Sequence, residues 1–386
     1  MTATGSRSCG WSAEARGLPD VVIVGGGAVG CATAYFLARA GARVTLLERG
    51  ELAGEASGAA AGMLAALSDE GGDRGPAFQS LCLASLHLYA EVLPELEATG
   101  IDLRHRRSGV LHLALTEEEA WRLRQRYEAQ KTLAPGLRWL DGAEVAGEEP
   151  EATPSAVAGL VSPTEHSLDP QRLVLALAEA ARRYGAVIKT GAPARGFRRH
   201  AKRLTAVRTA SEDHSVDAVV LAGGPWTARI ARRLGSFVPV RPMRGQMLAL
   251  GGSGVALRRV VWGSEAYLVP RENELTFVGA TVEDVGFRKR TTGAALRMLR
   301  REAARLAPRL GGARLVSAWA GLRPGSPDGL PIMGLLPGWS NVWVSTGHFR
   351  NGILLAPISG RLVASSLLAG RPEAELAAFD PARFRD

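Results

Sequence analysis

The chain has 386 residues, of which 46% are hydrophobic and 22% are charged. This length is enough for a large core in two or more domains, and the composition excludes a disordered chain or a small scaffold held by metal or disulfides. The formal net charge is +9, from 47 basic and 38 acidic residues, and only four of the basic residues are lysines. Because the basic runs are short and separated, we expect a solvated surface and no nucleic-acid partner.

The cysteines and the apolar stretches carry little targeting information. Cys9, Cys31 and Cys82 have neither the spacing of a zinc site nor that of a disulfide framework, so we expect no metal and a reducing, cytoplasmic environment. Residues 1–18 lack the apolar core of a signal peptide, and we expect a disordered extension there. The apolar stretch 21–38 contains four glycines, which favours strand, turn and helix over a membrane span.

The first predicted elements form a βαβ unit, in which apolar runs at 21–24 and 42–47 flank a helical pattern at 28–40. A loop rich in glycine, glutamate and proline near 147–154 is a candidate domain boundary. The other elements predicted up to residue 224 are helices at 76–98, 116–131 and 170–184, strands at 109–114 and 186–189, and a buried strand at 217–224 that leads into a glycine turn.

From residue 238 to 320 the pattern changes to short alternating strands with one arginine-rich helix, which indicates an antiparallel sheet. A final strand and an apolar helix follow, and Pro357 fits that helix only near its first turn. The strands are predicted at 246–250, 258–262, 266–270, 275–280, 314–319 and 342–346, and the helices at 293–307 and 352–368.

A glycine-rich sequence between the first strand and helix has the pattern GxGxxG, with Gly25, Gly27 and Gly30 at the fixed positions. These glycines allow a tight turn, close approach of backbone amides to a pyrophosphate, and helix–strand packing. The next strand ends at Glu48, whose carboxylate can accept hydrogen bonds from a ribose and disfavours a 2′-phosphate, although Arg49 adjoins it. The motif leaves NAD and FAD open.

Three later segments bear on that choice. The small-residue run at 53–64 can lie as backbone against an isoalloxazine ring, with a flexible loop as the alternative. The segment 320–329 places Arg323 on a turn shaped by proline and glycine, after the strand at 314–319. A helix starting within 347–355 would point its free amides at a ligand, and if that ligand is a flavin, these amides would stabilise negative charge on the reduced ring. His348 by itself is interpreted as a structural histidine.

Five sequences together carry a specific resemblance: SGAAAGML at 57–64, YLVPR at 267–271, VGAT at 278–281, WAGLRPGSPDG at 319–329 and GHFRNGILLAP at 347–357. Through them the chain resembles the D-amino-acid oxidase (DAO) family of FAD oxidoreductases over about residues 19–380, and most closely its glycine-oxidising members.

The resemblance implies a fold of the α/β class, α+β overall, with a glutathione-reductase-like, doubly wound FAD-binding domain and an antiparallel-sheet substrate domain. The expected FAD-binding domain is discontinuous and comprises 19–104, 163–237 and 325–386, whereas the substrate domain comprises 105–162 and 238–324. FAD is expected to be non-covalent, because related covalent flavoproteins use a late cysteine and this chain has none after Cys82. The resemblance also implies a homotetramer.

Motif and resemblance together predict the site residues. The predicted cofactor-binding residues are Gly25, Gly27, Ala28, Val29, Gly30, Glu48, Arg49, Ala56, Ser57, Ala61, Gly62, Met63, Ala194, His348, Phe349, Arg350, Asn351, Gly352, Ile353 and Leu354. The resemblance makes Arg323, Tyr267 and Arg350 the catalytic residues around a substrate carboxylate, and an arginine fork suits that task. It places Met63 and Val282 in the substrate pocket, where Val282 stands in place of a longer methionine.

The expected reaction is hydride transfer from the substrate Cα to flavin N5, followed by reoxidation by dioxygen to hydrogen peroxide and hydrolysis of the imine to an oxo acid and ammonia. Glycine, sarcosine and D-alanine are the candidate substrates, and glycine imine would pass to thiazole synthase for thiamine. The alternatives are a quinone-linked D-amino-acid or proline-type dehydrogenase and a catalytically silent flavoprotein scaffold.

Overall fold

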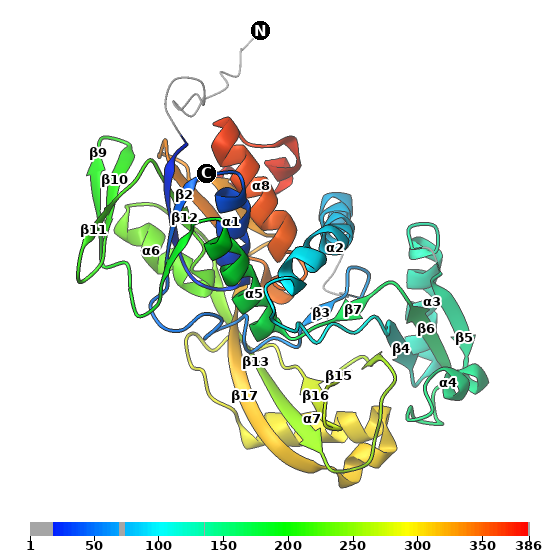
Figure 1. Cartoon of the computed structure of the whole chain (residues 1–386). Coiled ribbons are helices and arrows are strands. Elements are labelled where there is room, and N and C mark those ends of the chain that lie inside the picture. The colour runs from blue at the N-terminus through cyan, green and yellow to red at the C-terminus, as the bar shows by residue number, and fades with distance from the viewer. Residues whose placement is uncertain (1–17, 69–73, 135, 385–386) are drawn as a thin grey trace.

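The computed structural model describes residues 18–68, 74–134 and 136–384, so the extension predicted for 1–18 lies outside the described residues apart from its last position. A six-stranded sheet has the order β18-β19-β12-β1-β2-β8 and is parallel except for β18 (Figure 1). Its strands are β1 (Asp20–Val24), β2 (Arg43–Leu47), β8 (Val187–Lys189), β12 (Ala218–Leu221), β18 (Ile332–Leu335) and β19 (Val342–Thr346). The predicted βαβ unit lies at the centre of this sheet.

Both faces of this sheet are buried, as the apolar runs of its strands predict. On β1, Val21 and Ile23 pack into a core that they share with helices on one face, whereas Val22 and Val24 pack into a second core on the other face. The first face is covered by α1 (Ala28–Arg39), α2 (Gly75–Glu97), α5 (Pro170–Arg183) and α8 (Ala356–Ala369). The second is covered by α6 (Thr227–Arg233) and a small sheet of β9 (Gly196–His200), β10 (Arg203–Arg208) and β11 (Asp213–Ser215).

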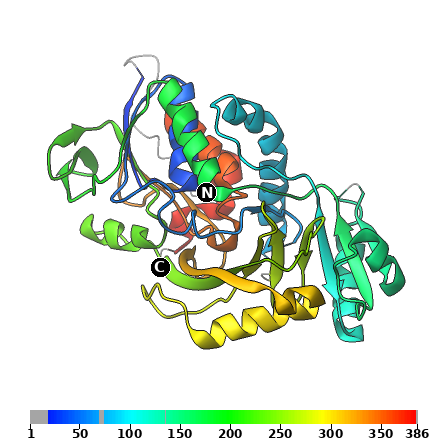
Figure 2. The same cartoon turned by 60° about the horizontal axis from the view of Figure 1, so that its bottom comes forward.

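An eight-stranded sheet forms the other half of the molecule, with the order β17-β13-β16-β15-β14-β4-β6-β5. Its neighbours pair antiparallel, except that β4 and β14 are parallel. In Figure 2 the yellow helix α7 (Gly293–Leu306) lies along the outer side of the sheet, where it packs against β13 and β16. The strands are β4 (Val110–Ala114), β5 (Arg138–Asp141), β6 (Ala158–Ser162), β13 (Arg241–Gly251), β14 (Val260–Trp262), β15 (Tyr267–Pro270), β16 (Thr276–Gly279) and β17 (Arg314–Gly325).

Short elements complete the chain. The strand pair β3 (Met63–Leu64) and β7 (His166–Ser167) connects the two halves, and α3 (Glu117–Gln130) and α4 (Gly142–Glu148) pack on the β4–β6 end of the large sheet. The 3-10 turns are η1 (Gly224–Trp226), η2 (Pro308–Gly312), η3 (Phe349–Asn351), η4 (Ala374–Phe379) and η5 (Pro381–Phe384). Within the described ranges, the structure contains no helix with the length and hydropathy that a membrane crossing requires.

Two local predictions differ from the structure. Arg323 was expected on a turn, but β17 continues through it and pairs with β13 as far as Gly325. Pro324 is compatible with this strand because β17 is an edge strand, where a missing amide costs no ladder hydrogen bond. The last helix was expected to begin at 352, but residues 349–351 form a 3-10 turn and α8 begins at Ala356. Pro357 lies in the first turn of α8, as predicted.

Candidate functional site

A cavity of about 560 Å³ is lined by residues from both large sheets. Most lining residues fall in the segments 24–29, 53–57, 59–63, 193–195, 222–226, 264–267 and 348–353. These segments lie at strand ends of the six-stranded sheet and on the facing strands of the eight-stranded sheet. The carboxyl ends of parallel strands are where doubly wound sheets bind their ligands, so the topology favours this cavity as the functional site.

The glycine motif shapes one wall of the cavity. Gly25 has φ +122°, and a Cβ there would lie less than 3.0 Å from the carbonyl of Ala222. A Cβ on Gly30 would collide in the same way with the carbonyl of Gly25. Gly25 and Gly27 line the cavity, whereas Gly30 lies behind them and permits the close packing of helix and strand. The start of α1 therefore reaches the cavity as bare backbone.

Glu48 lies beside this wall and lines the cavity. Its two carboxylate oxygens accept hydrogen bonds from the amides of Gly26 at 2.7 Å and Gly50 at 2.8 Å. These bonds fix the orientation of the carboxylate. Arg49 forms an ion pair with Glu55 at 2.6 Å and stacks on the ring of Trp226. Its charge is thus paired with an acid of the following loop.

The small-residue run forms a compact loop against the helix start. The Ser57 hydroxyl accepts a hydrogen bond from the amide of Ala28 at 3.0 Å, and both residues line the cavity. The large sheet holds the loop from the opposite side, because the indole of Trp319 donates to the carbonyl of Ala59 at 3.0 Å. Arg271 donates to the carbonyls of Ala61 and, at 3.0 Å, Leu168. This loop is therefore an ordered wall of the cavity.

The large sheet contributes the charged end of the site. Tyr267 on β15 and Arg323 on β17 both line the cavity, together with Arg350 from η3. Burial raises the pKa of Tyr267, although the positive charges of Arg323 and Arg350 act in the opposite direction. The phenol consequently stays protonated at neutral pH and serves as a hydrogen-bond donor.

Glycines on neighbouring strands make room for these side chains. A Cβ on Gly279, which is paired with Tyr267, would lie 2.6 Å from the phenol oxygen. A Cβ on Gly245 would lie less than 3.0 Å from the guanidinium of Arg323. Arg323 also donates through Nη1 to the carbonyl of Thr281 at 2.9 Å. The Tyr267 phenol and the Arg323 guanidinium therefore lie against the sheet at glycines, which have no side chain to displace them.

The segment after β19 closes the site. Residues 348–353 line the cavity, but Leu354 is buried and lies outside it. Burial lowers the pKa of His348 to about 3, so the ring is neutral, and its Nε2 is 2.9 Å from the hydroxyl oxygen of Ser359. This geometry agrees with the interpretation of His348 as a structural histidine.

The structure brings most of the predicted residues together. The predicted cofactor-binding residues line the cavity except Gly30 and Leu354, and Met63, Tyr267 and Arg323 line it too. Val282 does not: it lies outside the cavity and is 40% exposed. Several other residues also line the cavity and lie outside the predicted set, namely Gly223, Gly224, Trp226, Arg229, Arg233, Trp262, Ser345 and Thr346. The glycine turn after the strand predicted at 217–224 was a usable signal for the first two.

The cavity has the features of a dinucleotide site. It joins a glycine-lined helix start, where a Cβ on Gly27 would lie 3.1 Å from the Ser57 hydroxyl, to a wall of small residues. The hydroxyl of Ser345 is buried in this lining and lacks a hydrogen-bond partner among the described residues. A bound molecule with polar groups along its length would satisfy it. These residues fit FAD, and the bare backbone from Gly25 to Ala28 would hold its pyrophosphate.

The comparisons with known proteins agree with this geometry. The profile of the DAO family, "FAD dependent oxidoreductase", matches residues 20–366. The chain is 34% identical over 368 residues to the glycine oxidase of Geobacillus kaustophilus (strain HTA426), covering 95% of this chain and 96% of the relative. It is 34% identical over 371 residues to the bifunctional protein ThiO/ThiG of Trichormus variabilis, covering 95% of this chain and 55% of that protein.

Among solved structures, the crystal structure of glycine oxidase from Geobacillus kaustophilus matches with a TM-score of 0.89 and 32% sequence identity. That match covers 95% of this chain and 99% of the solved chain. The family profile spans most of the chain, and the glycine oxidase relative is aligned over nearly its whole length. The chain therefore belongs to the DAO family of FAD-dependent oxidoreductases and is an FAD-dependent amino-acid oxidase.

Proposed function

We propose that the enzyme oxidises glycine or another small amino acid, such as sarcosine or D-alanine, to the corresponding imine. The observation that carries this proposal is the convergence of Arg323, Tyr267 and Arg350 at one end of the cavity. A guanidinium is a permanently charged planar fork that suits a carboxylate, and a protonated tyrosine adds one directed hydrogen bond. The substrate class is therefore a molecule with one carboxylate and an amine next to it.

The residues of the chain orient the substrate. Arg323 binds its carboxylate, Tyr267 donates to the same group, and Arg350 adds positive charge on the side of η3. Holding the carboxylate at this end of the cavity limits the orientations that the Cα–H bond of the substrate can take. FAD, when bound, supplies the acceptor for the hydride that leaves Cα. We propose that binding is non-covalent and that dioxygen is the final electron acceptor, which gives hydrogen peroxide, while hydrolysis of the imine gives an oxo acid and ammonia.

The bifunctional ThiO/ThiG relative supports a further step in the proposal. This chain is aligned with 55% of the length of that relative, whose name joins ThiO with ThiG. We propose that the product imine can instead be passed to a thiazole synthase, and that the oxidase acts in the cytoplasm as a homotetramer.

A panel of amines tests the substrate class. Purified yellow protein is assayed for peroxide with glycine, sarcosine, D-alanine, D-proline and L-proline. We expect turnover with at least one of the first three. Flavin reduction without peroxide under air would refute dioxygen as the acceptor and favour a quinone-linked dehydrogenase. The absence of flavin reduction with every amine would refute the proposed substrate class and favour a silent flavoprotein.

The carboxylate clamp is tested by Arg323→Ala. We expect the flavin spectrum to be retained and KM for the best substrate to rise at least about a hundredfold, because a charge-assisted hydrogen-bonding partner is lost. The control is Arg314→Ala on the same strand, since Arg314 is exposed and lies outside the cavity. An unchanged KM in Arg323→Ala would overturn the assignment.

A further inference from the structure

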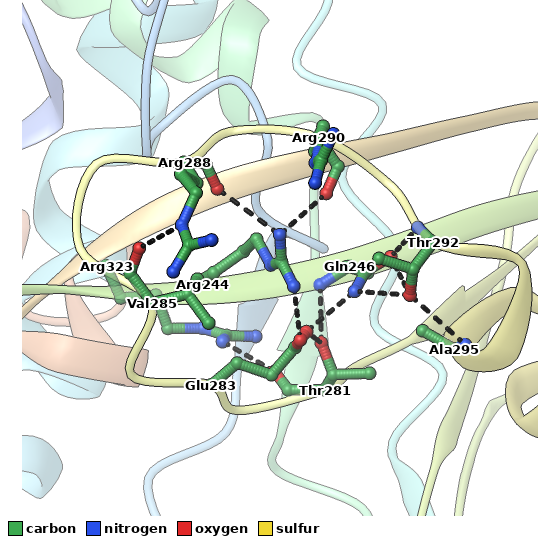
Figure 3. A network of polar contacts seen from close by, with 10 residues as sticks. All are labelled: Arg244, Gln246, Thr281, Glu283, Val285, Arg288, Arg290, Thr292, Ala295 and Arg323. Carbon is green, nitrogen blue, oxygen red and sulfur yellow. Dashed lines mark hydrogen bonds and ion pairs between the residues drawn. The ribbon is translucent and has the colours of Figure 1, made fainter.

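Behind the substrate side of the cavity, the large sheet carries a second polar group of side chains. Along β13, Gly245 and Met247 line the cavity, whereas the alternating residues Arg244 and Gln246 point away from it. Arg244 is 5% exposed and Gln246 is fully buried. Figure 3 shows that both meet the segment after β16, and we call Arg244, Gln246, Thr281, Glu283 and Thr292 the Glu283 cluster.

The carboxylate of Glu283 is the centre of this cluster. One oxygen forms an ion pair with Arg244, and the other accepts hydrogen bonds from Gln246 Nε2 at 2.7 Å and from the hydroxyl of Thr281 at 2.6 Å. Arg244 also donates to the carbonyl of Arg290 at 3.1 Å. Burial acts to raise the pKa of Glu283, but these contacts together outweigh it and lower the pKa to about 2, so the carboxylate is charged at neutral pH. The cluster thereby anchors the segment 281–292 to β13.

The backbone next to the cluster departs from a regular ladder. Arg244 and Glu283 exchange both backbone hydrogen bonds, at 2.8 and 2.9 Å. Two residues along, a regular antiparallel ladder would have the amide of Gln246 donate to the carbonyl of Thr281. Here that amide donates to the Thr281 hydroxyl instead, at 2.9 Å. The carbonyl of Thr281 accepts from Arg323 Nη1, at 2.9 Å.

We propose that Thr281, held by Glu283 and Arg244, is the positioning residue that aims Arg323 at the substrate carboxylate. The Thr281 hydroxyl donates to Glu283 and accepts from the amide of Gln246, and it thus takes the place of its own carbonyl in the ladder. The carbonyl is then available to orient the guanidinium on the cavity face. This inference rests on the proposed role of Arg323 and adds residues that do not themselves line the cavity.

Two variants of Thr281 separate its hydroxyl from its shape. In Thr281→Val the amide of Gln246 has only the carbonyl to donate to, so the carbonyl is drawn from Arg323 into the ladder. We expect KM for the amino-acid substrate to rise about tenfold, with kcat changed less than about threefold and the flavin spectrum unchanged. Thr281→Ser keeps the hydroxyl and should restore KM to within about twofold of the wild-type value. Equal KM values in Thr281→Val and the wild type would overturn the inference.

A double-mutant cycle decides whether Thr281 acts through Arg323. If it does, Thr281→Val causes no further rise in KM when it is added to Arg323→Ala, because the group that it positions is gone. A full tenfold rise in the double variant would overturn the inference. If Arg323→Ala alone leaves KM unchanged, the proposed function fails first, so the two failures are distinguishable.

Glu283→Gln tests the same chain of contacts from Glu283 through Thr281 to Arg323. It provides a second test of the inference if Thr281→Val does not fold. It keeps the shape of the side chain but removes the charge that faces Arg244. We expect KM of Glu283→Gln to be higher than that of the wild type. When Glu283→Gln is added to Arg323→Ala, we expect KM to stay at the value of Arg323→Ala alone. A KM rise of equal size in both backgrounds would overturn the inference.

Discussion

The Arg323 guanidinium occupies space that exists because Gly245 has no side chain, so Gly245→Ala should displace it. Gly245 lies within β13 and outside the left-handed region, so alanine fits the backbone and changes only the space above it. The added Cβ would lie less than 3.0 Å from three atoms of the Arg323 guanidinium, whereas ordinary contacts begin at 3.4 Å. The guanidinium must therefore retreat from its place by about 1 Å.

A displacement of about 1 Å in a substrate-positioning group costs about a hundredfold in rate, or about 2.7 kcal/mol of transition-state stabilisation. We therefore expect kcat/KM of Gly245→Ala to fall by about that factor, mainly through KM. The thermal unfolding temperature should not fall and the flavin spectrum should not change, because the backbone conformation suits alanine.

The assay compares initial rates of peroxide release over a range of substrate concentrations, with the amine that the panel selects. The matched control is Gly196→Ala in β9, where the new Cβ has its nearest neighbour at 3.6 Å and meets only ordinary contacts. Wild-type kinetics in Gly245→Ala would refute the reasoning. So would an equal loss in the control variant.

Two further predictions concern stability. Burial lowers the pKa of His348 to about 3 from 6.5, so the unfolded chain takes up a proton that the folded chain excludes, and stability falls as pH drops below about 6.5. At pH 5 this amounts to about 2 kcal/mol, so the loss of Tm between pH 7 and 5 should be smaller in His348→Asn, and an equal loss would contradict it. Arg271→Met leaves the carbonyls of Ala61 and Leu168 without their donor, and urea unfolding should show a loss of about 2 kcal/mol. A loss as small as that of exposed Arg314→Met would contradict this assignment.

Local patterns predicted the elements well where sequence periodicity and burial agree. The first βαβ unit is one case, because a continuous run of valines and isoleucine marks β1 and glycines mark its end. Arg323 is the opposite case. The sequence around Pro324 and Gly325 is typical of a turn, but pairing with the distant strand β13 decides its structure, and such pairing is not visible in a local window.

The residues of the site divide in the same way, into those that a local motif predicts and those whose position depends on distant strand pairing. Residues within motifs, such as Gly25 and Met63, line the cavity where the motif places them. Val282, which the resemblance places in the substrate pocket, lies outside the cavity and is 40% exposed. The clearance that Gly245 gives to Arg323 depends on the register between two strands more than 70 positions apart in the sequence. Neither property can be derived from residue types alone.

The cavity wall has a consequence for how the enzyme matures. Its lining begins at Val24 on the first strand of the chain and ends at Ile353, just before the last long helix. On the ribosome, the first glycine turn is therefore made long before its opposite wall exists. FAD can bind in its full set of contacts only after nearly the whole chain has been synthesised. Since a ligand that binds only the folded state stabilises that state, FAD can stabilise the new protein through all of these contacts only from this late step onward.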